Sequence, residues 1–131
     1  IKPDGEDLLS LVKGLSEYKG RIKLVVGDPL NGVYESPEQI AAAIDRQVLS
    51  QYELYPSNYV ALSLLQEEPF TEIWQKHRES FSNKFSSEES DQFMKRLDGC
   101  PIDHQKYFLE MYANPIVHIQ KTVPERFESG G

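Results

Sequence analysis

The stretch Gly20-Arg21-Ile22-Lys23-Leu24-Val25-Val26-Gly27-Asp28-Pro29 carries the clearest β-type signal in the chain. Apolar and β-branched residues dominate positions 21–26, and turn-forming residues follow them directly. The alternation of polar and apolar residues is only partial, because Val25 and Val26 are both apolar. That pattern is typical of a strand covered on both faces, so we predict a strand over residues 21–26.

Helical patterns lie on both sides of this stretch. Upstream, apolar residues at helical spacing predict a helix from about Glu6 to Tyr18, with Asp4 and Gly5 available to cap its start. Downstream, Ser36-Pro37-Glu38-Gln39 forms a capping box that predicts a helix reaching Val48. Further helices are predicted over the following ranges: 57–65, 71–83, 87–97 and 102–112. Asn114-Pro115 is expected to end the last of these, and residues 117–123 are a weaker candidate for a short terminal strand.

A strand with apolar residues on both faces needs neighbours for its backbone and covers for its faces. The chain offers at best one weak partner, near its C-terminus. We therefore predict an α/β fold class: the C-terminal portion of a larger α/β domain, mostly helical here, with one clear strand at 21–26. Residues 1–118 would form this part with its helical extension, and residues 119–131 a tail. The alternative is a self-contained helical domain with a two-stranded ribbon.

Composition narrows the classes of function. Fourteen basic and 21 acidic side chains give a net charge of -7, without the basic cluster that a nucleic-acid surface requires, so we expect no nucleic-acid partner. Cys100 is the only cysteine, which excludes an internal disulfide and suits a reducing cytoplasm. No apolar run approaches the length of a membrane span, and no signal-peptide pattern opens the chain. The start Ile1-Lys2-Pro3 lacks an initiator methionine, from which we expect further sequence upstream.

The residue types that carry chemistry are present but do not form a recognisable site. His77, His104 and His118 lack companions at metal-ligand spacing. Asp103 and His104 diverge as neighbours on a helix, so Asp103 is interpreted as a cap and His77 as a satisfied boundary residue. The acidic pairs Glu67-Glu68 and Glu88-Glu89 suit solvated helix starts, and Cys100 suits a small buried apolar side chain. We assign no catalytic, cofactor-binding or metal-binding residue and expect no cofactor.

Several motifs, taken together, resemble one family. Lys19-Gly20-Arg21-Ile22-Lys23-Leu24-Val25-Val26-Gly27-Asp28-Pro29-Leu30 is similar to a late-strand motif of bacterial 1-acyl-glycerol-3-phosphate (lysophosphatidic acid) acyltransferases, within the glycerophospholipid acyltransferase family. The runs 38–48, 55–61 and 111–117 are similar to later parts of one subgroup. The resemblance extends from about Glu6 to Val117, and its motifs are structural rather than catalytic.

The resemblance stops short of the family's catalytic residues. That family's acyl transfer is attributed to a His-x-x-x-x-Asp motif, in which the histidine is the general base. The residues at the aspartate position after the three histidines of this chain are Ser82, Leu109 and Val123. A second family motif, with Gly and Arg for the acceptor phosphate, is also missing. The resemblance therefore implies that both motifs lie upstream, and that this segment alone is inactive.

The resemblance implies a parent enzyme that transfers a fatty acyl group from acyl-CoA or acyl carrier protein to a lysophospholipid-type acceptor in phospholipid biosynthesis. The partners of this segment would be the upstream part of the same polypeptide and, through it, those substrates. The implied location is the cytoplasm, at the cytoplasmic face of the inner membrane, with peripheral membrane contact. The alternative is an independent helical protein-interaction or regulatory module without catalysis. A lipid-facing surface at Trp74, Phe81 and Phe85 is a third hypothesis, against which helical spacing of aromatics favours core packing.

Overall fold

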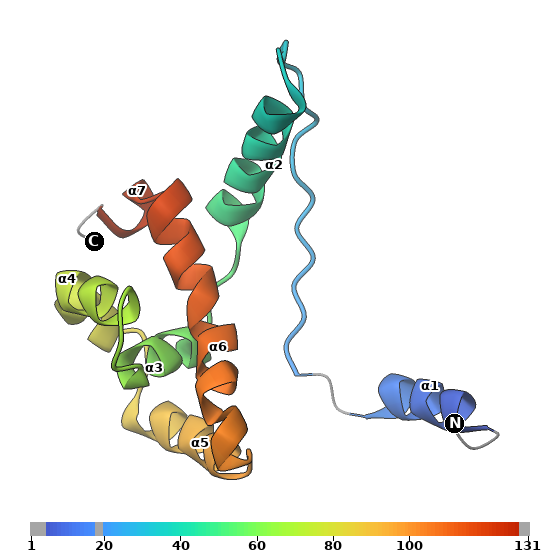
Figure 1. The fold of residues 1–131 in the computed structure, drawn as a ribbon, viewed down its shortest axis with the longest axis vertical. Coiled ribbons are helices and arrows are strands. Elements are labelled where there is room, and N and C mark those ends of the chain that lie inside the picture. Colours follow the sequence, from blue (N-terminus) through green and yellow to red (C-terminus); the bar gives the residue numbers. More distant parts are fainter. Residues whose placement is uncertain (1–4, 18–19, 129–131) are drawn as a thin grey trace.

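The computed structural model describes residues 5–17 and 20–128, and the regular elements of these residues are all helices. In chain order the helices are α1 (Glu6–Ser16), α2 (Pro37–Gln51), α3 (Pro56–Leu64), α4 (Phe70–Ser82), α5 (Ser87–Asp98), α6 (Ile102–Thr122) and α7 (Glu125–Glu128). Figure 1 shows α3 beside the long α6, with α4 and α5 around this pair and α1 standing apart. We refer to α3–α7 as the helical unit, and to α1, the extended segment 20–33 and α2 as the N-terminal arm.

The predicted helix starts agree with the structure because the capping chemistry is local. The Ser86 hydroxyl accepts from the Glu89 amide at 3.1 Å, and the Glu89 carboxylate accepts from the Ser86 amide at 3.1 Å, which completes a capping box at α5. At α2 the Ser36 hydroxyl accepts from the Gln39 amide at 3.3 Å. The Gln39 side chain reaches one residue further back, to the Glu35 amide, at 2.9 Å. The predicted end of the first helix at Tyr18 lies outside the described residues, as do its second proposed cap, Asp4, and the tail residues 129–131.

The core lies entirely within the helical unit. Its centre is α3, where Val60, Ala61 and Leu62 are at most 1% exposed, against Ala113 and Ile116 of α6, which are fully buried. Aromatic side chains of α4 and α5 close the two ends of this layer, with Phe81 and Phe93 each 1% exposed. No buried side-chain nitrogen or oxygen among the described residues lacks a hydrogen-bond partner. The buried apolar residues of the described chain therefore all belong to the helical unit.

The predicted α/β fold class with a strand over residues 21–26 is wrong. Residues 20–31 are extended, but none of them belongs to a strand, and the described residues contain no sheet. The physical reason is the absence of a partner: a strand is defined by its backbone hydrogen bonds to a neighbour. The only other predicted strand, over 117–123, is helical up to Thr122. The β-type composition of the segment therefore produces an extended backbone and nothing more.

The predicted end of the last long helix at Asn114-Pro115 is also wrong. Helix α6 continues through Pro115 to Thr122, so the predicted tail from residue 119 includes its last turn. Proline removes one backbone hydrogen bond and disfavours a helix interior by about 3 kcal/mol. Ala113, Ile116 and Ile119 are all 0% exposed on the face toward the core. Burial of this face on both sides of Pro115 holds the two halves of α6 in one helix.

Candidate functional site

The extended segment 20–33 has two chemically different faces. Arg21, Lys23 and Val25 line a groove that the segment forms with α2, together with Gly27. The intervening residues Ile22, Leu24 and Val26 are 77%, 88% and 85% exposed. Side chains of an extended chain alternate between opposite faces, which accounts for this division. One face of the segment is therefore held against the protein, and the other presents apolar side chains to solvent.

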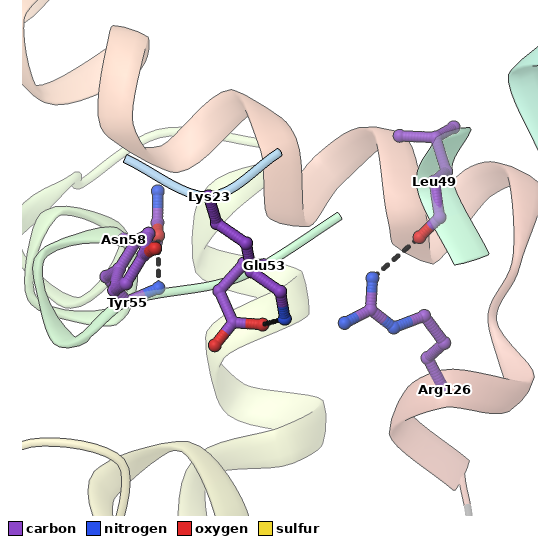
Figure 2. Close-up of polar contacts among 6 residues, drawn as sticks. All are labelled: Lys23, Leu49, Glu53, Tyr55, Asn58 and Arg126. Atoms are coloured by element: carbon purple, nitrogen blue, oxygen red, sulfur yellow. Dashed lines mark hydrogen bonds and ion pairs between the residues drawn. The ribbon is translucent and has the colours of Figure 1, made fainter. Parts of the chain in front are cut away.

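Specific contacts hold the inner face in place. The Lys23 ammonium lies 2.6 Å from a Glu53 carboxylate oxygen, as Figure 2 shows. The Arg21 guanidinium lies over the Tyr55 ring, 5.1 Å from its centroid. The Gln47 side-chain amide donates to the Asp28 carbonyl at 2.9 Å. These three contacts lie along most of the segment, so they fix which of its residues face α2 and the connection that follows α2.

The electrostatics of this surface are those of exposed ion pairs. The hydrogen bond from Lys23, and then its charge, lower the pKa of the Glu53 carboxyl below its usual value. Both side chains are about half exposed, at 50% and 44%. Water and salt screen such a pair, so it orients the segment more than it stabilises the fold.

Gly27 allows the segment to approach α2 closely. A Cβ atom at this position would lie 2.3 Å from the Gln47 side-chain oxygen, well inside van der Waals contact. Any side chain at position 27 must displace Gln47, whose amide holds the Asp28 carbonyl. The glycine that ends the β-type stretch in the sequence therefore serves a close contact with a helix.

The groove between the segment and α2 has a volume of about 510 Å³ and a largely apolar lining. Its apolar and aromatic lining residues are Val25, Leu30, Ile44, Val48, Tyr52 and Tyr55. Arg21 and Lys23 also line it, but each already has a partner in Tyr55 or Glu53. The groove therefore offers a largely hydrophobic surface whose two cationic side chains are already held by partners.

Helices α1 and α2 extend the exposed apolar surface of the arm. Helix α1 has no buried residue, and its exposed apolar side chains are Leu8, Leu9, Leu11, Val12 and Leu15. On α2, Ile40, Ile44 and Val48 are 39%, 46% and 54% exposed. Large exposed apolar surfaces mark interaction sites in proteins. The arm is therefore the candidate functional site, as a surface for binding another polypeptide segment.

The arm is joined to the helical unit by polar contacts at the end of α2. Arg46 donates to the Thr122 carbonyl at 3.1 Å and pairs with the Glu125 carboxylate. Arg126 donates to the Leu49 carbonyl at 2.6 Å, which Figure 2 also shows. The backbone amide of Glu125, followed by Arg46, lowers the pKa of the Glu125 carboxyl. This joint positions α2 on α6 and α7 without burying the apolar face of α2.

The structure places the three histidines in different surroundings. His77 is 8% exposed, its Nε2 lies 2.8 Å from the Gln120 amide oxygen, and its ring stacks on Phe81 at 5.0 Å. His104 and His118 are both exposed on α6. Among residues 5–17 and 20–128, no three His, Cys, Asp or Glu side chains could jointly hold a metal ion. His77 therefore has the surroundings of a structural side chain.

The other residues singled out from the sequence are also part of the framework. The interpretation of Asp103 as a cap is wrong, because α6 begins after Pro101 without a side-chain cap and Asp103 is exposed in its first turn. Cys100 is half-buried after α5. Trp74 lies 6.4 Å from Phe81 and 6.3 Å from Phe85 between ring centroids, at the edge of the core. Core packing, rather than a lipid-facing surface, therefore accounts for these aromatics. No helix within the described ranges is long and apolar enough to cross a membrane.

Comparison with protein-family models, with curated proteins and with solved structures finds no match for this chain.

Sequence reasoning missed the groove and the contacts that build it. The signal was present in the alternation of Arg21 and Lys23 with Ile22, Leu24 and Val26, which separates a cationic side from an apolar side. Their partners Glu53 and Tyr55 lie about thirty residues later, on the connection after α2. No local pattern links positions at that separation.

Proposed function

We propose that this chain is the C-terminal, non-catalytic part of an acyltransferase, and that its N-terminal arm binds the upstream, catalytic part of the same polypeptide. The parent enzyme transfers a fatty acyl group from acyl-CoA or acyl carrier protein to a lysophospholipid-type acceptor. It works in the cytoplasm, in peripheral contact with the cytoplasmic face of the inner membrane. The observation that carries the proposal is the uncovered arm, whose extended segment 20–33 exposes Leu24 at 88% and Val26 at 85%.

The physical argument rests on the apolar side chains that the arm exposes to solvent. Each buried large apolar side chain contributes about 1.5–3 kcal/mol relative to its exposed state. Ile22, Leu24 and Val26 contribute none of this while they face water. A partner that covers them gains that stabilisation, and an extended backbone also offers donors and acceptors to the edge of a partner's sheet. The similarity of residues 19–30 to the acyltransferase motif supports a catalytic part of that family as the partner.

The polar groups of the chain agree with a non-catalytic role. The buried histidine, His77, is held by Gln120 and aromatic rings inside the helical unit. The groove residues Arg21 and Lys23 are held by Tyr55 and Glu53. In this proposal the general base and the groups that hold the acceptor phosphate belong to the upstream part, and this chain supplies a docking surface and a helical extension.

The test uses the native protein from its source cell. Its intact mass and upstream sequence are determined first, and we expect a product about twice this size or larger with His-x-x-x-x-Asp before Ile1. The purified protein is then assayed for transfer of a labelled acyl group from acyl-CoA or acyl carrier protein to lysophosphatidic acid, and the 131-residue chain is expected to be inactive. A native product that starts near Ile1, or a longer one without acyl transfer, contradicts the proposal.

Two matched substitutions connect the arm to the activity. Leu24→Asp in the native protein replaces an exposed apolar residue of the arm, and Ile102→Asp replaces one of the helical unit that is 84% exposed. We expect Leu24→Asp to reduce acyl transfer at least tenfold and Ile102→Asp to leave it within twofold. Equal effects of the two substitutions would show that the arm has no special role.

The second candidate function is an independent helical interaction module. The observation that favours it is the closed core of α3–α7, which includes Phe93 and Ile116 and needs no residue of the arm. A native protein of this size that selectively retains a protein partner would support the module. The intact-mass measurement separates the two candidates before any binding assay is made.

A further inference from the structure

The groove between the extended segment and α2 has the dimensions of a small-molecule site. Its volume of about 510 Å³ lies within the range of roughly 300–1,000 Å³ that is typical of ligand pockets. A stable interface between two polypeptides buries about 1,200–2,000 Å² of surface, much more than the lining of this groove exposes. By size, the groove is therefore suited to a small molecule rather than to a second protein chain.

The two walls of the groove run in opposite directions along the chain, and Figure 1 shows the segment beside α2. Three contacts establish the order: Gln47 with Asp28, Glu53 with Lys23, and Tyr55 with Arg21. Beyond the first of these contacts, Leu30 and Ile44 lie toward the same end of the groove. The groove therefore has an apolar end at Leu30 and Ile44 and a cationic end at Arg21 and Lys23.

The two cations differ in what they can still bind. The Lys23 ammonium is engaged by the Glu53 carboxylate at 2.6 Å. The Tyr55 ring attracts the charge of Arg21 but accepts no conventional hydrogen bond from it, and the guanidinium donates to no other residue of the described chain. A guanidinium carries five N–H donors in a planar fork that matches a carboxylate. Arg21 is therefore the group at this end that can hold an anion.

The walls between the two ends are apolar and accessible. Val25 of the segment and Ile44 and Val48 of α2 line the groove, and each is between 43% and 54% exposed. An apolar molecule that lies along them removes this surface from water. Each methylene group buried in this way tightens binding about fourfold. The groove thus favours a ligand that is elongated and apolar along most of its length.

We propose that the groove binds an amphipathic carboxylate, a small molecule with an elongated apolar body and one anionic end. The carboxylate accepts hydrogen bonds from the Arg21 guanidinium, and the body lies along Val25 and Val48 toward the apolar end. Lys23 stays on Glu53 and contributes positive charge nearby. The direction of the ligand is fixed, because the far end of the groove offers no cationic side chain.

This site is separate from the surface on which the proposed function depends. It lies on the inner face of the segment, so Ile22, Leu24 and Val26 remain exposed for the upstream part. The acyl group of a thioester donor has no free carboxylate, so it is not the ligand described here. The inference therefore goes beyond the proposed function and does not rest on it.

The test is a titration of the 131-residue chain with decanoate, below its micellar concentration, followed by the methyl resonances of Val25, Ile44 and Val48. Decanol has the same chain length without the charge and serves as the matched probe. Met111, an exposed apolar residue of the helical unit at 59%, reports nonspecific adsorption. We expect saturable shifts at the three groove residues, none at Met111, and binding of decanoate about tenfold or more tighter than that of decanol.

Two pairs of substitutions separate the cationic end from the apolar wall. Arg21→Gln is compared with Arg78→Gln, which changes an exposed arginine of α4. Ile44→Glu is compared with Ile40→Glu, because Ile40 lies on the same helix and is 39% exposed but does not line the groove. All four positions are at the surface, and circular dichroism confirms that each variant is folded. The methyl spectrum without ligand shows whether the segment stays on α2.

We expect Arg21→Gln to weaken decanoate at least tenfold and to leave decanol within twofold, and Ile44→Glu to weaken both. The two control variants should stay within twofold of the original chain. Equal affinities for decanoate and decanol, shifts at Met111 as large as those in the groove, or equal effects of Ile44→Glu and Ile40→Glu would overturn the proposal. Absence of saturable binding would also overturn it and would leave a polypeptide segment as the occupant. Because no acyl transfer is measured, each of these failures is distinct from a failure of the proposed function.

Discussion

The N-terminal arm and the helical unit are both rich in large apolar residues, but most of these side chains are exposed in the arm and buried in the helical unit. Of the 18 large apolar side chains that are exposed among the described residues, 15 precede residue 54, and the other three are Ile102, Tyr107 and Met111. The buried apolar residues all lie between Tyr59 and Val123. Apolar composition therefore does not determine burial in this chain, and the availability of neighbouring elements does.

The difference lies in the number of surfaces that each region can supply. Helix α3 has α4, α5 and α6 around it, so most large apolar side chains of the helical unit meet others. The arm has only α2 to offer to the extended segment, and α2 is joined to the unit through Arg46 and Arg126 rather than through its apolar face. A region whose apolar side chains have no neighbouring element packed on them is suited to binding a partner. This supports the arm as the functional surface.

The largest expected effect is on the core of the helical unit. Phe93 is 1% exposed, and its ring lies 5.6 Å from Phe108 and 5.4 Å from Tyr112 between centroids. We expect Phe93→Ala to reduce the free energy of unfolding by about 3–5 kcal/mol because it removes a buried ring and leaves a cavity. Leu24→Ala in the arm is the control, and urea denaturation should show a change below about 0.5 kcal/mol. Comparable losses in the two variants would remove the distinction between the regions.

A smaller effect is expected from a buried amide at the start of α3. Asn58 accepts from the Tyr55 amide at 2.7 Å and donates to the Tyr112 carbonyl at 2.8 Å, which ties α3 to α6. Asn58→Ala leaves both backbone groups without their partner, and we expect a loss of about 1–3 kcal/mol in the free energy of unfolding. The matched change in the arm is Asn31→Ala at an exposed position, for which thermal and urea denaturation should detect no shift.

A change in α1 should be confined to the arm. A Cβ atom at Gly14 meets open space, so the helical glycine is not required by packing in this structure. We expect Gly14→Ala to favour the helical state of α1 by about 1 kcal/mol, visible as added helical circular dichroism. The midpoint of unfolding of the helical unit should stay unchanged. A shift of that midpoint would mean that α1 is coupled to the core.

The smallest effect is expected from pH. Lys23 lowers the pKa of Glu53 in the folded chain, so the pair's contribution is present above the usual value of 4.5 and is lost as the pH falls through the folded value. Because the pair is exposed, global stability should barely respond. The methyl resonances of Val25, which lines the same groove two residues after Lys23, should report release of the segment as the pH is lowered from 6 to 3. Glu53→Gln should abolish that pH response, and an unchanged response would assign it to another group.

The sequence predicted those parts of the fold that depend on local chemistry. Ser36 and Ser86 cap α2 and α5 as expected, because a cap involves residues three positions apart. The predicted helix end at Pro115 was wrong because burial of Ile116 and Ile119, a tertiary effect, outweighs the local cost of a proline inside the helix.

The prediction of a strand over 21–26 was wrong for a related reason. The composition of this stretch favours an extended backbone, whereas a strand also requires a partner strand, which the described residues do not contain. The apolar composition of the site was visible in the sequence, at Ile22, Leu24 and Val26. Its geometry was not, because the contacts from Arg21 and Lys23 to Tyr55 and Glu53 join positions about thirty residues apart.

The central claim is that the helical unit is complete while the backbone of the extended segment remains open for a partner. Hydrogen–deuterium exchange of the 131-residue chain, resolved by residue with NMR, tests this directly. We expect the amides of residues 21–28 to exchange at the rates of an unstructured peptide, and those of Leu62 and Ile116 to be protected at least a thousandfold. Protection of residues 21–28 similar to that of α3 and α6 would contradict the account, because it would show that the segment already has a backbone partner within the chain.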